Sequence, residues 1–187
     1  MEAAPFSLES LVRQYHTRRP VIQRAYQQMF ELAHHLVNAR RLQHTFAAAE
    51  LPLLADCLPG AETLTLGLCT VGPRLEAEVV KLFEQDPMSA YALDEIGTRW
   101  VNELARGMHL EIRQTARAQG RQASPAYRPG IGRWPVELQD QIFEHLPAAE
   151  AEIELLEGMI MLPQKSISLI VAVGVKLKRH CYAPKVK

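Results

Sequence analysis

The sequence predicts an α+β fold, in which a mainly antiparallel sheet packs against helices and is preceded by an N-terminal helical segment. Four segments carry apolar residues at helical spacing. Three others, residues 63–70, 155–162 and 167–175, are strand-like in composition. With 187 residues, 48% of them hydrophobic, the chain can bury a core without disulfides or metals. We expect the three strand-like segments to share one sheet.

The first 60 residues are expected to form the helical segment. Pro20 suits the first turn of a helix predicted over residues 20–45. Apolar residues recur along it at helical spacing: Val21, Ala25, Met29, Leu32 and Leu36. A joint is then predicted by three helix breakers: Pro52, Pro59 and Gly60. We therefore divide the chain into residues 1–60, a helical segment packed on the main domain, and residues 61–187, the main domain.

The middle of the chain is predicted to hold one strand and two helices. The stretch "TLTLGLCT" alternates leucine with threonine or glycine, which is typical of a strand. The stretch "RLEAEVVKLFEQ" follows as a short amphipathic helix. A long helix is predicted from about Ala90 to Ala118. One apolar stripe runs along it: Leu93, Ile96, Trp100, Leu104, Met108 and Ile112.

The last third is predicted to contain a helix and two strands. Pro135 suits a helix start, and we expect Trp134 to be buried beside that helix. Two apolar runs follow, separated by residues 163–166. Because β-branched residues dominate the second run, we predict a pair of antiparallel strands.

Composition excludes several classes of partner. Lys+Arg and Asp+Glu number 21 each, so no overall field favours nucleic acid or an acidic membrane. The cysteines, Cys57, Cys69 and Cys181, are few and widely spaced, which argues against a disulfide framework. The N-terminus lacks the pattern of a secretory signal, and the longest apolar run is too short to span a bilayer. We expect a cytoplasmic protein.

The usual motifs of catalysis and metal binding are absent from the sequence. The histidines never fall at H-x-x-x-H or H-E-x-x-H spacing, so no metal ligands are assigned. The sequence contains neither the G-x-S-x-G of hydrolases nor the glycine-rich phosphate-binding motifs. No catalytic residue is assigned.

Two stretches of the C-terminal half nevertheless resemble a known family. "RPGIGRWPVELQDQIFEHL" and "LLEGMIMLPQKSISLIVAVG" are similar to the activation domain of cobalamin-dependent methionine synthase, which carries a P-G-Y loop, a helix and a T-E-S-x-x-M-x-P strand. The matching positions are Pro129, Gly130, Ile142, Phe143, Glu144, Glu157, Met161, Pro163, Ser166 and Ser168. Upstream, the T-x-G motif at residues 70–72, the L-D-x-x-G motif at residues 93–97 and Glu103 resemble the shorter, free-standing bacterial members of this family. The resemblance covers about residues 62–175.

The resemblance implies an α+β accessory subunit for reductive reactivation. Such a domain binds S-adenosylmethionine beside a corrinoid, so that reduction of the cobalt is trapped by methyl transfer. A stiff turn suits this task, because proline fixes the backbone and glycine permits close approach of a ligand. The candidate ligand-binding residues are Glu103, Arg128, Pro129, Gly130, Ile131, Gly132, Glu157 and Lys165; Lys165 and the turn at residues 130–132 are the alternative carboxylate sites if Arg128 does not bind.

The loop departs from the family pattern R-x-[SA]-P-G-Y at two positions. Ala126 stands where the pattern has arginine, and Ile131 where it has tyrosine. Arg128 lies two residues from the expected arginine position; it is the candidate to bind the methionyl carboxylate, and the alternative is a side chain that faces solvent. For Glu157, placed in an apolar strand, the alternatives are an outward-facing side chain or a polar neighbour. For Glu103 the alternative is an ordinary helix-surface residue.

Three functions remain open from the sequence. The D-x-H-x-x-G signature of many corrinoid proteins is missing, so the corrinoid is expected on a partner protein or methyltransferase, and the chain would act within a methyltransferase system rather than alone. The second reading is a degenerate, non-catalytic relative that serves as an interaction or assembly module. The third is an unrelated small-ligand-binding α+β domain.

Overall fold

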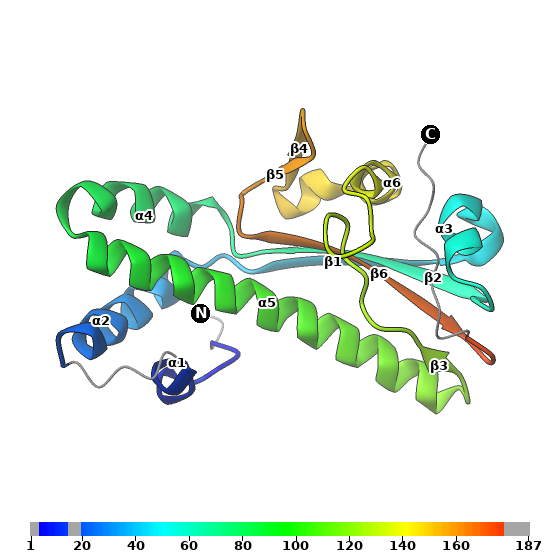
Figure 1. Ribbon diagram of the computed structural model, residues 1–187, viewed down its shortest axis with the longest axis horizontal. Helices are drawn as coiled ribbons and strands as arrows, with labels where there is room; N and C mark the ends of the chain where they lie inside the picture. Colours follow the sequence, from blue (N-terminus) through cyan, green and yellow to red (C-terminus); the bar gives the residue numbers. More distant parts are fainter. Residues whose placement is uncertain (1–3, 15–19, 178–187) are drawn as a thin grey trace.

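A four-stranded antiparallel sheet lies at the centre of the protein (Figure 1). The computed structural model describes residues 4–14 and 20–177. The strand order is β1-β2-β6-β3, with β1 at Arg40–Ala47, β2 at Thr63–Thr70, β6 at Ser166–Gly174 and β3 at Gln122–Ala123. The α+β class and the antiparallel pairing of the segments at 63–70 and 167–175 are confirmed.

Helices cover both faces of this sheet (Figure 1). On one face lie α1 (Leu8–Gln14), α2 (Pro20–Leu36), α4 (Pro73–Gln85) and α5 (Pro87–Ala118). On the other lie α3 (Pro52–Cys57), α6 (Leu138–His145) and the 3-10 turn η2 (Ala148–Ala151). A further 3-10 turn, η1 (Ala48–Glu50), follows β1.

The alternation of side chains along the two central strands produces two hydrophobic cores. Leu66 and Ile170 contribute to the core beneath α6, whereas Cys69 and Val171 contribute to the core beneath α5. Each core holds one tryptophan: Trp100 on the α5 side and Trp134 on the α6 side. Both are largely buried, so the predicted burial of Trp134 beside the following helix is confirmed.

The prediction that residues 40–45 continue a helix is wrong. Helix α2 ends at Leu36, and Arg40–Ala47 pair along their whole length with β2. Within β1, Leu42 and Phe46 pack against the core beneath α6, which matches the two-residue period of a strand. The boundary proposed at residue 60 remains a prediction, but a strand from its N-terminal side belongs to the central sheet.

The prediction that residues 155–162 join the main sheet is also wrong. They form a separate hairpin of β4 (Glu154–Leu156) and β5 (Ile160–Leu162). A turn divides the apolar run, because Gly158 and Met159 both adopt positive φ, 79° and 63°. Glu157 therefore lies in an exposed turn and not within an apolar strand.

The predicted helices at 74–85 and 90–118 are confirmed as α4 and α5. The helix expected from Pro135 begins three residues later, at Leu138, because residues 135–137 form a turn before it. Cys181 lies outside the described residues, while Cys57 and Cys69 are buried, and each thiol donates to a backbone carbonyl.

Candidate ligand-binding site

A groove of about 600 Å³ lies between α5 and the segment that follows β3. Helix α5 lines one side with Asn102, Glu103, Ala105, Arg106 and His109. The facing segment lines the other with Ala126, Tyr127, Arg128, Ile131 and Trp134. Asn102, Arg106 and His109 share one face of the helix because they are four and three residues apart. Two stretches separated in sequence thus form one concave surface.

The facing segment is held in place by the sheet and by α5. Tyr127 exchanges two backbone hydrogen bonds with Ile170 of β6, at 2.9 and 2.8 Å. The Ser124 N–H donates to the Ala172 carbonyl at 2.8 Å, and the Ser124 carbonyl lies 2.8 Å from His109 Nε2. These contacts fix where the following turn begins.

The turn itself is compact and is anchored by an aromatic pair. The Gly130 N–H donates to the Trp134 carbonyl at 2.8 Å, closing the loop. Gly130 and Gly132 have φ values of 81° and 65°, which residues with a Cβ rarely adopt. Trp134 stacks on Tyr127 at 4.5 Å between ring centroids and is only 8% exposed. The turn therefore offers a fixed backbone surface at the edge of the groove.

The charged groups of the groove pair with neighbours on α5. Arg128 Nη1 donates to Asn102 Oδ1 at 2.9 Å, and Arg106 Nε lies 2.6 Å from Glu103 Oε2. The Glu103 side chain is 18% exposed, whereas Arg106 is 75% exposed. The groove thus carries two guanidinium groups against one carboxylate, an excess of positive charge that suits a ligand bearing a carboxylate.

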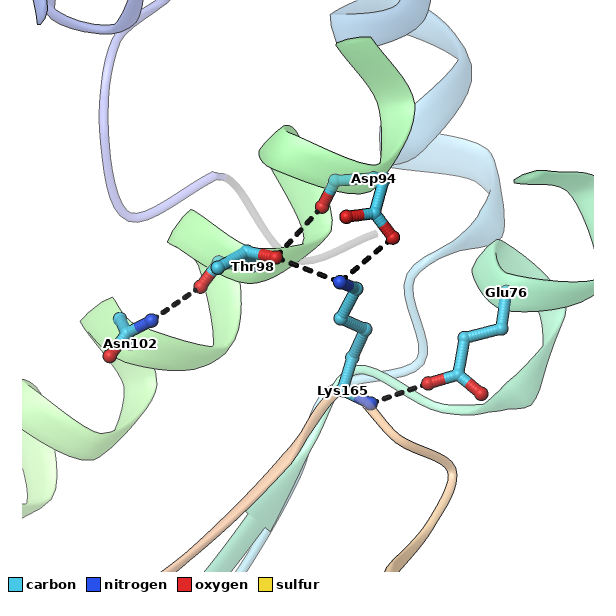
Figure 2. Close-up of polar contacts among 5 residues, drawn as sticks. All are labelled: Glu76, Asp94, Thr98, Asn102 and Lys165. Atoms are coloured by element: carbon cyan, nitrogen blue, oxygen red, sulfur yellow. Dashed lines mark hydrogen bonds and ion pairs between the residues drawn. The ribbon is translucent and has the colours of Figure 1, made fainter. Parts of the chain in front are cut away.

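Lys165 belongs to a polar cluster that reaches the groove through α5 (Figure 2). Its Nζ lies 2.8 Å from Asp94 Oδ1 and donates to Thr98 Oγ1 at 2.8 Å. Its backbone N–H donates to the Glu76 carboxylate, which ties the start of β6 to α4. Asn102 Nδ2 in turn donates to the Thr98 carbonyl at 2.8 Å.

This cluster determines the orientation of the Asn102 amide. Because Nδ2 donates to the Thr98 carbonyl, Oδ1 points the other way and accepts from Arg128. The Thr98 hydroxyl donates to the Asp94 carbonyl, so its oxygen is free to accept from Lys165. Lys165 and Arg128 are thus linked through two residues on one face of α5: Lys165 bonds the Thr98 hydroxyl, and Asn102 bonds the Thr98 backbone carbonyl and Arg128.

The groove brings together some of the residues expected from the sequence. Glu103, Arg128 and Ile131 line it, and Pro129, Gly130 and Gly132 form the adjoining turn. Lys165 is connected only through Thr98 and Asn102, and Glu157 lies in the hairpin turn and does not line the groove.

Sequence reasoning missed several groove residues: Asn102, Arg106, His109 and Tyr127. Three of them mark a polar face of α5 opposite its apolar stripe, and that periodicity was the available signal. Among the described residues, no group of three or more His, Cys, Asp and Glu side chains is placed to hold a metal ion. No helix in the described part of the chain is long and apolar enough to cross a membrane.

Comparison with known proteins gives a structural match but no sequence match. No protein-family model matches the sequence, and none of the curated proteins does. Among solved structures, the crystal structure of the MetH reactivation domain bound to AdoHcy is similar, with a TM-score of 0.67 and 15% sequence identity. The similarity covers 100% of this chain and 78% of that one. The protein therefore has an α+β fold similar to that of this domain.

Proposed function

We propose that this protein is an accessory subunit that binds S-adenosylmethionine and assists the reductive methylation of a corrinoid carried by a partner protein or methyltransferase. The proposal rests on the fold, which along the whole chain is similar to a domain solved with AdoHcy, the demethylated form of that methyl donor. It is supported by the groove, because Glu103, Arg128 and Ile131 line it.

The groove matches the chemistry of this ligand in three respects. Arg128 and Arg106 offer planar forks for the methionyl carboxylate. The Glu103 carboxylate favours the cationic end of the ligand, where an ammonium and a sulfonium lie. The stacked rings of Tyr127 and Trp134 provide a rigid apolar wall for the adenosyl part.

The contribution of this chain is positional. A corrinoid on the partner would supply the methyl-accepting cobalt, with its electron from a separate reductant. The residues of the turn and of α5 would hold the donor in one orientation, which converts an encounter of two molecules into an oriented transfer. The groove is open to solvent, as docking of a second protein requires.

Calorimetric titration of the chain with S-adenosylmethionine and S-adenosylhomocysteine tests the binding step. We expect Arg128→Ala to weaken binding about 10- to 150-fold, the usual effect of losing a hydrogen bond to a charged group. Arg128→Lys should recover only part of this loss, because an ammonium cannot form the two-donor fork. Arg133→Ala is the matched control, since Arg133 is exposed in the same turn but does not line the groove.

A second function, that of a non-catalytic assembly module, is favoured by the pairing within the groove. Both arginines already have partners on α5, Asn102 and Glu103. Ile131 is 59% exposed, an apolar side chain at the mouth of the groove. Absence of binding at millimolar ligand by the unmodified chain would reject the methyl-donor proposal and favour this module.

A further inference from the structure

The outer edge of strand β1 is open. Strand β1 is the first in the order β1-β2-β6-β3, and among the described residues no strand pairs with its other side. It is eight residues long, Arg40–Ala47, and six of these residues are exposed. A long uncovered edge presents unpaired backbone donors and acceptors to which another strand can bind.

The hydrogen-bonding pattern shows which residues face outward. In an antiparallel pair, alternate residues bond to the neighbouring strand and the others point away. The Ala48 N–H donates to the Glu62 carbonyl, one step beyond the last pair of the β1–β2 register. The even-numbered residues of β1 therefore bond to β2, and Arg41, Gln43 and Thr45 turn their N–H and C=O groups outward. The next outward N–H, that of Ala47, is taken by Glu50 Oε2 at 2.6 Å.

The charges on this edge are neutralised within the chain. Arg41 lies 2.8 Å from Glu111 of α5, and Arg40 lies 3.5 Å from Glu152. Gln43 and Thr45 are uncharged and line a groove of about 480 Å³ between the sheet and the C-terminal half of α5. Among the residues that the structure describes, this edge has neutral side chains around three backbone positions without partners. It therefore lacks the unpaired charge by which proteins usually block edge pairing.

We propose that β1 pairs with β1 of a second copy of this chain, antiparallel and centred on Gln43, so that two four-stranded sheets become one continuous sheet. In this register Arg41 lies opposite Thr45, and Gln43 opposite Gln43. Leu42 lies opposite His44, so no two like charges face each other. All three outward positions are then hydrogen-bonded. A parallel arrangement would instead set Arg40 and Arg41 beside their own copies.

Charge selects a second copy over a charged peptide as the occupant. Because both edge arginines already have carboxylate partners, the edge offers no uncompensated charge for a partner to neutralise. The antiparallel self-pairing supplies backbone groups and neutral side chains from both sides. It also places the second copy's Gln43 and Thr45 beside the 480 Å³ groove, which gains a wall from the partner.

Sedimentation equilibrium from about 1 µM to about 1 mM protein tests the dimer, a range that covers the affinities of weak to moderate interfaces. Gln43→Pro removes an outward N–H and leaves the β1–β2 bonds intact. Because the two copies of Gln43 exchange two backbone hydrogen bonds in the dimer, we expect Gln43→Pro to raise the dissociation constant about 30-fold or more. Gln43→Ala keeps the N–H and should dimerise nearly as the unmodified chain does. A chain that stays monomeric throughout, or a dimer indifferent to Gln43→Pro, would overturn the proposal.

Cross-linking provides a second test that fixes the register. Hydrogen-bonded antiparallel pairs have Cα atoms about 5.5 Å apart, which suits a disulfide. In a Cys181→Ser background, Gln43→Cys should form an intermolecular disulfide under mild oxidation. Gln85→Cys, exposed at the end of α4, is the control and should not do so faster than by random collision. Equal cross-linking of the two variants would contradict the proposed register.

Discussion

Asp86 begins the helix that carries half of the groove. Its Oδ2 accepts from the Ser89 hydroxyl at 2.6 Å, and its Oδ1 accepts from the Ser89 backbone N–H at 3.2 Å. Pro87 follows as the first helical residue, where a missing N–H has no cost. The bonds from Ser89 hold the pKa of the Asp86 carboxyl below its usual 3.8. One side chain thus satisfies an orphan donor at the start of a 32-residue helix.

Replacing Asp86 should make stability depend less on pH. A carboxyl with a lowered pKa in the folded state stabilises the protein above its unfolded pKa and loses this effect as the pH falls through the folded value. We therefore expect Asp86→Ala to melt at a lower temperature than the unmodified chain at pH 7. This difference in melting temperature should become smaller as the pH falls from about 4 toward 2.

The control for this cap is Asp86→Asn. Asparagine keeps an oxygen that can accept the Ser89 bonds but has no charge to titrate in this range. It should retain part of the stability without the pH dependence. Circular dichroism melts measure the difference in melting temperature between Asp86→Ala and the unmodified chain. A difference that stays constant across this pH range would contradict the capping account.

Helix α5 contains two glycines whose surroundings differ. A Cβ added at Gly97 would lie 2.7 Å from Leu75 Cδ2, and Leu75 is fully buried between α4 and α5. A Cβ added at Gly107 would meet nothing within 4 Å. The first glycine allows the two helices to approach closely, whereas the second has no packing role.

Alanine at these two positions should have opposite effects. Gly107→Ala should raise the free energy of unfolding by about 0.5–1 kcal/mol, the usual helix-propensity gain. At Gly97 the same gain is opposed by the cost of overpacking against Leu75, about 1–3 kcal/mol. We therefore expect Gly97→Ala to lower the free energy of unfolding. Urea denaturation of both variants measures the difference. Equal stabilisation by both would show that Leu75 moves aside without cost.

Elements with a consistent local pattern could be predicted from the sequence, and others could not. The apolar stripe of α5 and the alternation of β2 are strong periodic signals, and both elements were predicted. Strand β1 was missed because its exposed face and mixed composition give no clear period, and its conformation depends on pairing with β2. The hairpin was merged into one strand because Gly158 and Met159 lie inside an apolar run, where the turn was overlooked.

At the scale of the whole molecule, the groove depends on contacts that the sequence pattern does not contain. The sequence indicated the turn at 128–132 and Glu103 as candidates. They lie next to each other only because Tyr127 pairs with Ile170 of β6, which is 43 residues later in the chain. Lys165 was an alternative candidate for the carboxylate, and its amine contacts Asp94 and Thr98. Long-range pairing therefore decides which candidates share a site.

The same central strands hold the two cores together. Strands β2 and β6 each send alternate side chains into the core beneath α5 and the core beneath α6. Unfolding of either core exposes one face of both strands, and the other core then loses much of the packing that holds these strands in place. Because each core contains one tryptophan, the two faces can be observed separately.

We expect both faces to unfold in one cooperative transition. In Trp134→Phe, fluorescence reports the α5 side through Trp100, and in Trp100→Phe it reports the α6 side through Trp134. Within each variant, the fluorescence midpoint in urea should coincide with the midpoint from far-ultraviolet circular dichroism, which follows the helices of the whole chain. Comparing two probes within one variant removes the effect of the substitution itself on stability. If the α6 side lost its fluorescence signal at lower urea than the helices did, the two faces would be independent units and the sheet would not couple them.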